Sequence, residues 1–454
     1  MTQIGEIREA FDILTTLKQE RSTKAKEWTL QMHEDNQVLK ILLYYAFNTF
    51  KQYYIKQVPS PEPAQKDIDP NNYTAFLSLL EALNERTFKQ VKDRVNDFLT
   101  KCNADEQYWY RRVLLRNLEI GITAKGVNKV YTNLIPVYEV LLAESIKDPT
   151  LTDAKTLARL PEAFVLQYKI DGYRLNVHKN TKGDVVVKTR SGLPVFGYAK
   201  MEEEAKRLLP AGKVYDGEMV SPELFAWIER NMFSDRDEKI ADRSLFRDAV
   251  SKVFSKETDK QGIFNIFDVV DSSEWESQNA KKSYNDRLSY LNTDVKEILT
   301  ASNASQMTVV PTSRVFYRDN PDDIAETIRI FHKFLSWGWE GLMIKSVSSP
   351  YEWKRSKSIW KMKLMDTADL EVLDVVEGAG ERSGMVGKLV CDYKGTILNI
   401  GTGKMTLDDC AKYYQNPNLI VGKTIEVLYQ AESVGKNGEP VLDFARYKRI
   451  RKDK

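Results

Sequence analysis

Phe164–Arg174, with the sequence FVLQYKIDGYR, joins an apolar run directly to a group of charged side chains. The apolar start predicts a β-strand, so Lys169 would stand at a strand end close to the carboxylate of Asp171. The pair Asp171-Gly172 is also typical of a hairpin turn, in which Lys169 and Arg174 would be solvated flanks. The stretch alone leaves both interpretations open, so the rest of the sequence must decide between them.

The length and composition predict a globular protein of about three domains. The chain has 454 residues, 42% hydrophobic and 29% charged, and a net charge of only +2. It has no run of 18 apolar residues and no signal-peptide pattern, so we expect a cytoplasmic protein (host cytoplasm if viral) without a membrane partner. Three cysteines, none at C-x-x-C spacing, and three histidines argue against a disulfide framework or a zinc site.

Residues 1–132 have the pattern of a helical domain. Asn103 followed by Glu106 predicts a helix start with a capping box. The apolar residues that follow at helical spacing are Tyr110, Val113, Leu114 and Leu118. Gly121 is a plausible stop for this helix, and a second helix begins after Thr123.

The remaining chain is rich in short strands. Residues 133–366 mix apolar runs with helix-like stretches, which predicts an α+β domain; the runs are Phe164–Leu166, Val185–Val187, Ile263–Val270, Thr308–Val310 and Gly341–Val347. Residues 367–454 have glycine turns between closely spaced runs, which are Glu371–Val376, Lys388–Tyr393, Thr396–Ile400 and Lys423–Tyr429. This spacing predicts a small β-barrel, with the OB-fold as the natural candidate.

No P-loop is present for nucleotide binding. The nearest match is Gly422-Lys423-Thr424, but Pro417 stands where the first glycine of G-x-x-x-x-G-K-[ST] is required. Any use of ATP must therefore depend on another arrangement.

Polar motifs follow Lys169 in a fixed order. They are TRSG (189–192), YDGEMV (215–220), FNIFD (264–268), EGLMIK (340–345), IWKMK (359–363) and RIRKD (449–453). Each has an ordinary structural explanation, such as a polar turn, a buried strand or solvated lysines. If IWKMK is a strand, Lys361 and Lys363 face the same side of it. Chance, however, does not readily explain why all of these motifs occur together and in this order.

These motifs together resemble the ATP-dependent DNA ligases of the covalent nucleotidyltransferase superfamily, in particular those of bacteriophages. The likeness covers about residues 105–454. It implies a multidomain fold: an all-α DNA-binding domain (1–132), an α+β nucleotidyltransferase (adenylation) domain (133–366) and a C-terminal β-barrel OB-fold domain (367–454). It also implies nicked double-stranded DNA as the partner of a monomeric enzyme.

The resemblance assigns roles to individual residues. Lys169 would be the nucleophile that carries AMP, with Asp171, Lys361 and Lys363 completing the catalytic group. The implied ATP-binding residues are Gln167, Arg174, Arg190, Glu218, Phe267, Lys345, Arg355, Arg449, Arg451 and Asp453. Glu218 and Glu340 would serve a metal ion, which we expect to be Mg²⁺, with Mn²⁺ as a substitute.

The implied reaction has three steps. Lys169 takes AMP from ATP, AMP moves to the 5′-phosphate at a nick, and the 3′-hydroxyl displaces AMP to close the strand. The alternatives are an RNA ligase or a GTP-using capping enzyme of the same superfamily, or a non-catalytic relative that only binds nucleic acid. An NAD-dependent ligase is disfavoured because the chain lacks the cysteines of that group's zinc module.

Two positions depart from the family pattern. Gln167 stands where many relatives have glutamate, which makes selection of the nucleobase less secure. Trp360 lies one position later than in many relatives, so its packing role need not transfer.

Overall fold

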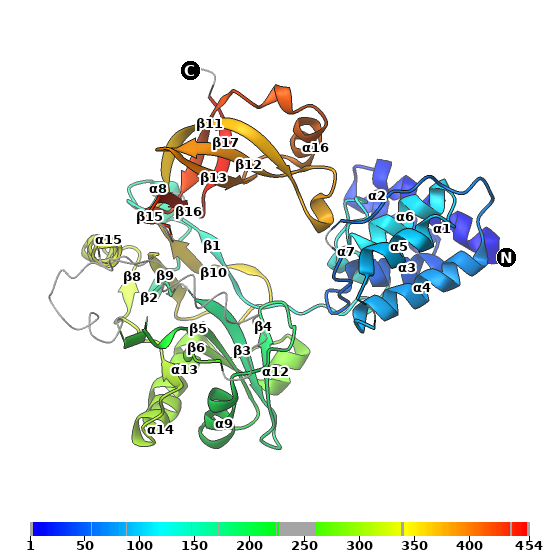
Figure 1. The fold of residues 1–454 in the computed structure, drawn as a ribbon. Helices are drawn as coiled ribbons and strands as arrows, with labels where there is room; N and C mark the ends of the chain where they lie inside the picture. Colours follow the sequence, from blue (N-terminus) through cyan, green and yellow to red (C-terminus); the bar gives the residue numbers. More distant parts are fainter. Residues whose placement is uncertain are drawn as a thin grey trace. The chain divides into compact units, whose positions relative to one another are not determined.

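A computed structural model describes residues 3–55, 57–87, 89–146, 148–170, 172–223, 225–226, 260–336, 340–435 and 438–451 (Figure 1). The chain forms two compact units. The first contains Met1–Val137, Thr367–Tyr429 and Glu439–Lys454, and the second contains Tyr138–Asp366 and Gln430–Gly438. This division places the helical region and the barrel in one unit, so the three-domain boundaries remain a prediction.

The N-terminal region is helical, as predicted. Its helices are α1 (Gln3–Gln19), α2 (Thr23–Met32), α3 (Gln37–Phe47), α4 (Pro70–Asn84), α5 (Val91–Leu99), α6 (Ala104–Leu114) and α7 (Ala124–Val130). They are amphipathic and share one apolar core, in which Phe76 stacks on Tyr110 with ring centroids 4.2 Å apart. The apolar faces therefore account for the assembly of this region.

The capping box before α6 is confirmed, but the predicted end of this helix is wrong. The Asn103 side chain accepts a hydrogen bond from the Glu106 backbone N–H, and the Glu106 carboxylate accepts one from the Asn103 backbone N–H. The helix ends at Leu114, and Arg116 adopts the left-handed conformation (φ 58°) in which a helix commonly terminates. Gly121 also has a positive φ (62°), but it lies in the loop before α7.

The second unit contains two five-stranded sheets. The first sheet has the order β1 (Leu142–Ser145), β10 (Arg355–Met362), β9 (Leu342–Ser346), β2 (Ala163–Tyr168) and β8 (Phe316–Tyr317). The second sheet has the order β4 (Val185–Thr189), β3 (Tyr173–Lys179), β5 (Lys213–Val220), β6 (Ile263–Asp271) and β7 (Met307–Val309). Each of the five apolar runs predicted for this region overlaps one of these strands.

Helices cover one face of each sheet. Within the described residues, the helical segments of the unit include α8 (Ala154–Leu157), α9 (Ala199–Leu208), α12 (Ser272–Ser277), α13 (Tyr284–Tyr290), the π-helix η1 (Leu291–Val295), α14 (Lys296–Ala301) and α15 (Pro321–Ser336). Leu342 and Ile344 of β9 pack in a core with Phe331 of α15. Leu175 and Val177 of β3 pack in another core that includes residues of α9, η1 and α14. Because side chains alternate along a strand, the intervening residues face the opposite side of each sheet.

The C-terminal region contains a closed five-stranded barrel, which confirms the predicted barrel. Its strands are, in order, β11 (Asp366–Glu377), β12 (Val386–Tyr393), β13 (Thr396–Gly401), β17 (Arg446–Ile450) and β14 (Thr424–Tyr429). The region also contains α16 (Leu407–Gln415), the 3-10 turns η2 (Gly380–Arg382) and η3 (Pro417–Leu419), and the short strands β15 (Ala431–Val434) and β16 (Pro440–Asp443).

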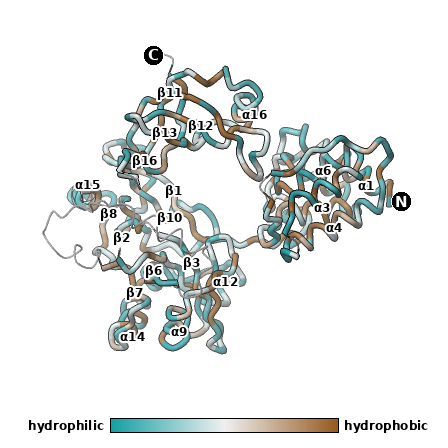
Figure 2. Tube along the Cα trace, in the orientation of Figure 1, coloured by the Kyte–Doolittle hydropathy of each residue, from teal (hydrophilic) through white to brown (hydrophobic). Residues whose placement is uncertain are grey.

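Apolar and polar residues are interleaved along the helices and strands (Figure 2). Within the described residues, no helix has the length and apolar character needed to cross a bilayer.

Candidate functional site

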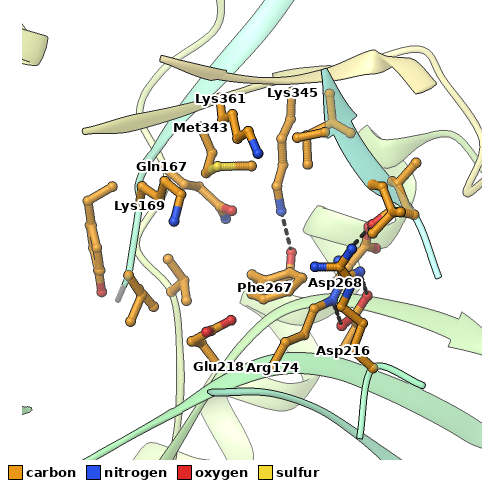
Figure 3. Close-up of a pocket in the computed structure, with 18 of the residues that line it drawn as sticks. Gln167, Lys169, Arg174, Asp216, Glu218, Phe267, Asp268, Met343, Lys345 and Lys361 are labelled. Atoms are coloured by element: carbon orange, nitrogen blue, oxygen red, sulfur yellow. Dashed lines mark hydrogen bonds and ion pairs between the residues drawn. The ribbon is translucent and has the colours of Figure 1, made fainter. Parts of the chain in front are cut away.

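Residues of both sheets line a cavity of about 240 Å³ in the second unit (Figure 3). Figure 3 shows Gln167, Lys345 and Lys361 entering from the first sheet, opposite Arg174 and Glu218 of the second. The predicted site residues that line this cavity are Gln167, Lys169, Arg174, Arg190, Glu218, Phe267, Lys345, Arg355 and Lys361. Residues that span almost 200 positions of sequence therefore meet in one pocket.

The segment that contains Lys169 links the two sheets, so the hairpin interpretation is wrong. β2 ends at Tyr168 in the first sheet, and β3 begins at Tyr173 in the second. The Lys169 backbone N–H donates to the carbonyl of Gly341 at 2.9 Å. A Cβ on Gly172 would lie 2.3 Å from the Met219 carbonyl oxygen, so glycine is required where this link passes β5. The predicted catalytic residue Asp171 lies outside the described residues.

Glu340 holds Lys169 and Lys363 together. One carboxylate oxygen forms an ion pair with Lys169 Nζ, and the other accepts from Lys363 Nζ at 2.8 Å. Burial raises the pKa of Glu340, but the two ammonium groups lower it more, and the pKa falls below its ordinary value. Gly341 makes this approach feasible, because its φ is 143° and a Cβ there would lie 2.1 Å from the Met362 carbonyl oxygen.

Two more lysines reach the pocket from the first sheet. Burial, and then the nearby Lys363 and Lys169, lower the pKa of Lys361. Lys345 is only 4% exposed, and burial lowers its pKa to about 8. Its Nζ donates to the Phe267 carbonyl at 3.0 Å and lies 4.6 Å from the centre of the Phe267 ring (Figure 3). This sheet therefore concentrates positive charge that its own residues only partly neutralise.

A bulge in β6 brings two consecutive side chains into the pocket. Asp216 pairs with Asp268, while the next residue of β5, Gly217, pairs with Ile266. Phe267 is left as the extra residue on β6, so both Phe267 and Asp268 line the cavity. The aromatic wall of the site thus depends on an irregularity that the FNIFD motif does not indicate.

A buried network fixes Arg174 on the second sheet. Its Nε and Nη2 donate to the two oxygens of Asp216 at 2.8 and 2.5 Å, and Tyr351 donates to Asp216 at 2.8 Å. Asp216 has no solvent exposure. Burial alone would lower the pKa of Arg174, but Asp216 raises it above its ordinary value. The guanidinium is thereby held charged and rigid 5.4 Å from the Phe267 ring.

Comparison with known proteins identifies the family of this site. Residues 141–363 match the family described as ATP dependent DNA ligase domain. The chain is 27% identical over 452 residues to a DNA ligase of Enterobacteria phage T4, with 91% of this chain and 89% of the relative covered. Residues 141–363 are thus an ATP-dependent DNA ligase domain. The resemblance inferred from the motifs is thus confirmed.

Other comparisons agree with this family. A DNA ligase of Pyrobaculum neutrophilum is 24% identical over 278 residues, covering 58% of this chain and 43% of the relative. The solved structure titled Pmar-Lig_PreS3 is similar with a TM-score of 0.77 and 20% identity, covering 97% of this chain and 99% of that one. At this identity the structural likeness shows a shared fold.

The remaining predicted residues have other surroundings. Gln167 donates its amide N–H to the Thr312 hydroxyl at 2.8 Å, which fixes the amide within the pocket. Burial, and then Arg174 and Arg355, lower the pKa of Arg190, which follows β4. Glu218 lies beside Arg174 in the register of β5 and β3.

The predicted C-terminal residues belong to the first unit, whereas the pocket belongs to the second. Arg449 pairs with Glu426 at 2.5 Å, and Arg451 pairs with Asp369 at 3.0 Å. Asp453 lies outside the described residues.

Three groups of this site were not predicted from the sequence: Asp216, Asp268 and Tyr351. Asp216 and Asp268 are both inside recognised motifs, and a charged residue within an apolar strand was an available signal. Tyr351 lies outside every motif, and no local pattern marks it.

Proposed function

We propose that the chain seals 5′-phosphate/3′-hydroxyl nicks in duplex DNA through AMP bound to Lys169. The amine attacks the α-phosphorus of ATP, forming an N–P bond while the P–O bond to pyrophosphate breaks. An oxygen of the 5′-phosphate at the nick then displaces the lysine, giving 5′-adenylated DNA. Finally the 3′-hydroxyl attacks that 5′-phosphorus and AMP leaves. The carrying observation is that Lys169, the cations Lys361 and Lys345 and the aromatic Phe267 line one pocket.

Lys169 must lose a proton before it can attack. The usual lysine pKa of about 10.4 keeps the amine charged at neutral pH. The contact with Glu340 stabilises the charged form, so we infer that this ion pair opens in the reactive complex. Lys361 and Lys363 would then disfavour the ammonium form while they attract the phosphates.

Different residues of the pocket would contact the adenine, the ribose and the phosphates of the nucleotide. Phe267 would stack on adenine, and Gln167 would present its amide to the edge of the base. Arg174 and Arg190 would contact the ribose or the phosphate at the nick. Lys345 and Arg355 would complete the charge around the phosphates, which leaves positioning and electrostatic stabilisation as the main contribution of the protein.

The residues present fit a Mg²⁺ ion bound together with phosphates. Within the described part of the chain, no group of three His, Cys, Asp or Glu side chains could hold a metal alone. Mg²⁺ commonly uses one or two carboxylates with phosphates and water, and Glu218 lines the pocket as such a carboxylate. Glu340 would be available once it separates from Lys169. When bound, the ion would neutralise phosphate charge.

The other regions would act on the substrate. We assign DNA binding to the helical residues 1–132 and an OB-fold to the barrel of residues 367–454, with the adenylation domain at 133–366. Arg449, Arg451 and Asp453 would orient pyrophosphate as the leaving group, and Asp171 would position the 3′-hydroxyl. Contacts to phosphates and to the shape of the duplex would give binding of a monomer with little base preference.

Labelling with α-³²P-ATP tests the proposal. The wild type should form an acid-stable adduct that mass spectrometry places on Lys169, and Lys169→Ala should form none. The exposed Lys182→Ala is the matched control and should label normally. Lys169→Ala should still join DNA that already carries a 5′-adenylate. An adduct on another lysine would contradict the proposal, and preferential joining of nicked RNA would support the RNA ligase alternative.

A further inference from the structure

β10 has a large irregularity directly before Lys361. Ala143 of β1 pairs with Ser356, but the next residue, Glu144, pairs with Trp360. Residues 357–359 therefore have no partner on β1. The indole N–H of Trp360 donates to the Lys357 carbonyl at 2.7 Å and closes the bulge. Bulges of this kind change the direction in which neighbouring side chains point.

The bulge separates two sites. Ile359 lines the nucleotide pocket, whereas Lys357 lines a second, open groove of about 530 Å³. Arg355 lines both, so the two sites are neighbours within the second unit. We call the second site the β10 groove; its basic residues are Arg159, Lys354, Arg355 and Lys357.

The β10 groove has the chemistry of a phosphate site. Four cations line it against two carboxylates, Glu144 and Glu352. Glu352 is already engaged by Lys354 at 2.8 Å and by the Ser356 hydroxyl. The hydroxyls of Ser346, Ser349, Ser356 and Ser358 add neutral hydrogen-bonding groups. Arginine, lysine and serine side chains together are typical of contacts to nucleic-acid phosphates.

The cations of the groove are accessible. The Lys354 side chain is 61% exposed, and both Lys357 and Arg159 are exposed. The Arg159 guanidinium also lies 5.0 Å from the centre of the Trp360 ring. Trp360 therefore both closes the bulge and packs against a basic side chain of the groove. Exposed cations in an open groove suit a long polyanion, whereas the smaller pocket beside it suits a nucleotide.

We propose that the β10 groove binds backbone phosphates of the DNA next to the nick. This inference rests on the proposed function and adds a DNA contact outside the motifs. Arg355 would lie between the bound nucleotide and the DNA strand. Lys354, Lys357 and Arg159 would bind phosphodiesters without reading bases.

The test compares two double variants with equal loss of charge. Lys354→Ala/Lys357→Ala removes two cations of the groove, and Lys182→Ala/Lys200→Ala removes two exposed lysines elsewhere in the same unit. Kd for nicked duplex is measured across a salt series, and adenylation of Lys169 is measured in parallel. For the groove variant, the slope of log Kd against log salt should fall by up to about 1.8, at about 0.9 per contact. Its adenylation rate should equal that of the control.

Three outcomes would overturn the inference. A salt slope equal to that of the control would show that the groove does not contact DNA. Slower adenylation or weaker pyrophosphate binding, with unchanged DNA affinity, would show that the groove binds phosphates of the nucleotide and not phosphates of the DNA. Lys354→Arg/Lys357→Arg should retain the wild-type slope, and a loss there would indicate a packing defect instead. If the wild type itself forms no adduct on Lys169, the proposed function fails while the DNA-binding comparison still stands.

Discussion

The two sheets of the second unit place charge in the pocket in opposite ways. On the first sheet, Lys345 and Lys361 have lowered pKa values, because burial and neighbouring cations disfavour their charged forms. On the second sheet, Arg174 has a raised pKa, because Asp216 accepts two of its hydrogen bonds. One side therefore holds cations that a bound anion would stabilise, and the other holds a cation that the fold has already neutralised.

This difference separates two tasks of a nucleotide site. The lysine side gains most when phosphates arrive, since their charge offsets the cost of burying ammonium groups. The arginine side is rigid before any ligand binds, which fixes its geometry. Changes on the lysine side should therefore affect catalysis more than stability, and changes in the arginine network should do the reverse.

The largest stability effect should follow Asp216→Asn. This change leaves the Arg174 guanidinium without its charged partner, and breaking a buried ion pair costs about 3–5 kcal/mol. Urea unfolding monitored by circular dichroism measures the loss. The double variant Arg174→Met/Asp216→Asn should recover part of it. If the single variant is as stable as the wild type, the second sheet is not held by this pair.

Lys361→Met should affect the reaction instead of the fold. Loss of one charged contact to the transition state costs about 100-fold in rate. Removing an ammonium beside Lys363 and Lys169 should leave the free energy of unfolding unchanged or slightly raised. Single-turnover adenylation measures the rate, with Lys182→Met as control. A variant that is unstable but adenylates normally would contradict the view that the lysines of the first sheet serve catalysis more than stability.

Glu340→Gln should lower stability in a pH-dependent way. The pKa of Glu340 is lower in the folded protein than its usual unfolded value of about 4.3, so its contribution is present above that value. The contribution disappears as pH falls through the lowered folded pKa, where the carboxylate is protonated in both states. We expect a loss of about 1–3 kcal/mol at pH 7 that shrinks below about pH 4. Unfolding free energies at several pH values check this, and a pH-independent loss would contradict it.

Tyr351→Phe should have the smallest effect. It removes the hydrogen bond to Asp216 and the acceptor of the Leu141 backbone N–H at 3.1 Å, which costs about 1–2 kcal/mol, while both bonds from Arg174 to Asp216 stay. Tyr138→Phe is a suitable control, because its hydroxyl contacts Asn176 and His178 instead. Thermal unfolding compares the two variants. Equal losses of stability with unequal effects on ATP affinity would show that Tyr351 positions Arg174 specifically.

Local patterns predicted most of the elements correctly. The capping box at Asn103 and the strand runs around Lys169 and Phe267 depend on residues a few positions apart, which the sequence displays directly. The end of α6 was misplaced because a glycine was assumed to be needed, whereas Arg116 adopts the same left-handed conformation. Local rules thus located elements better than their boundaries.

Contacts over long sequence distances could not be predicted. Lys169 and Glu340 are 171 positions apart, and Asp216 and Tyr351 are 135 apart. A side chain within an apolar strand indicates burial, but not which partner makes the burial favourable. The bulges that place Phe267 and Lys357 are likewise set by pairing with neighbouring strands.

The sequence by itself determined which chemical groups are available and the order in which they occur, because motifs are properties of the chain. It left open whether Lys169 flanks a hairpin or enters a pocket. Only the tertiary structure decided this, by placing β2 and β3 in different sheets, so that the link between them carries the lysine to Glu340. The physical reason is that strand pairing and burial join residues that are far apart in the sequence. These contacts determine which charged side chains lie close together.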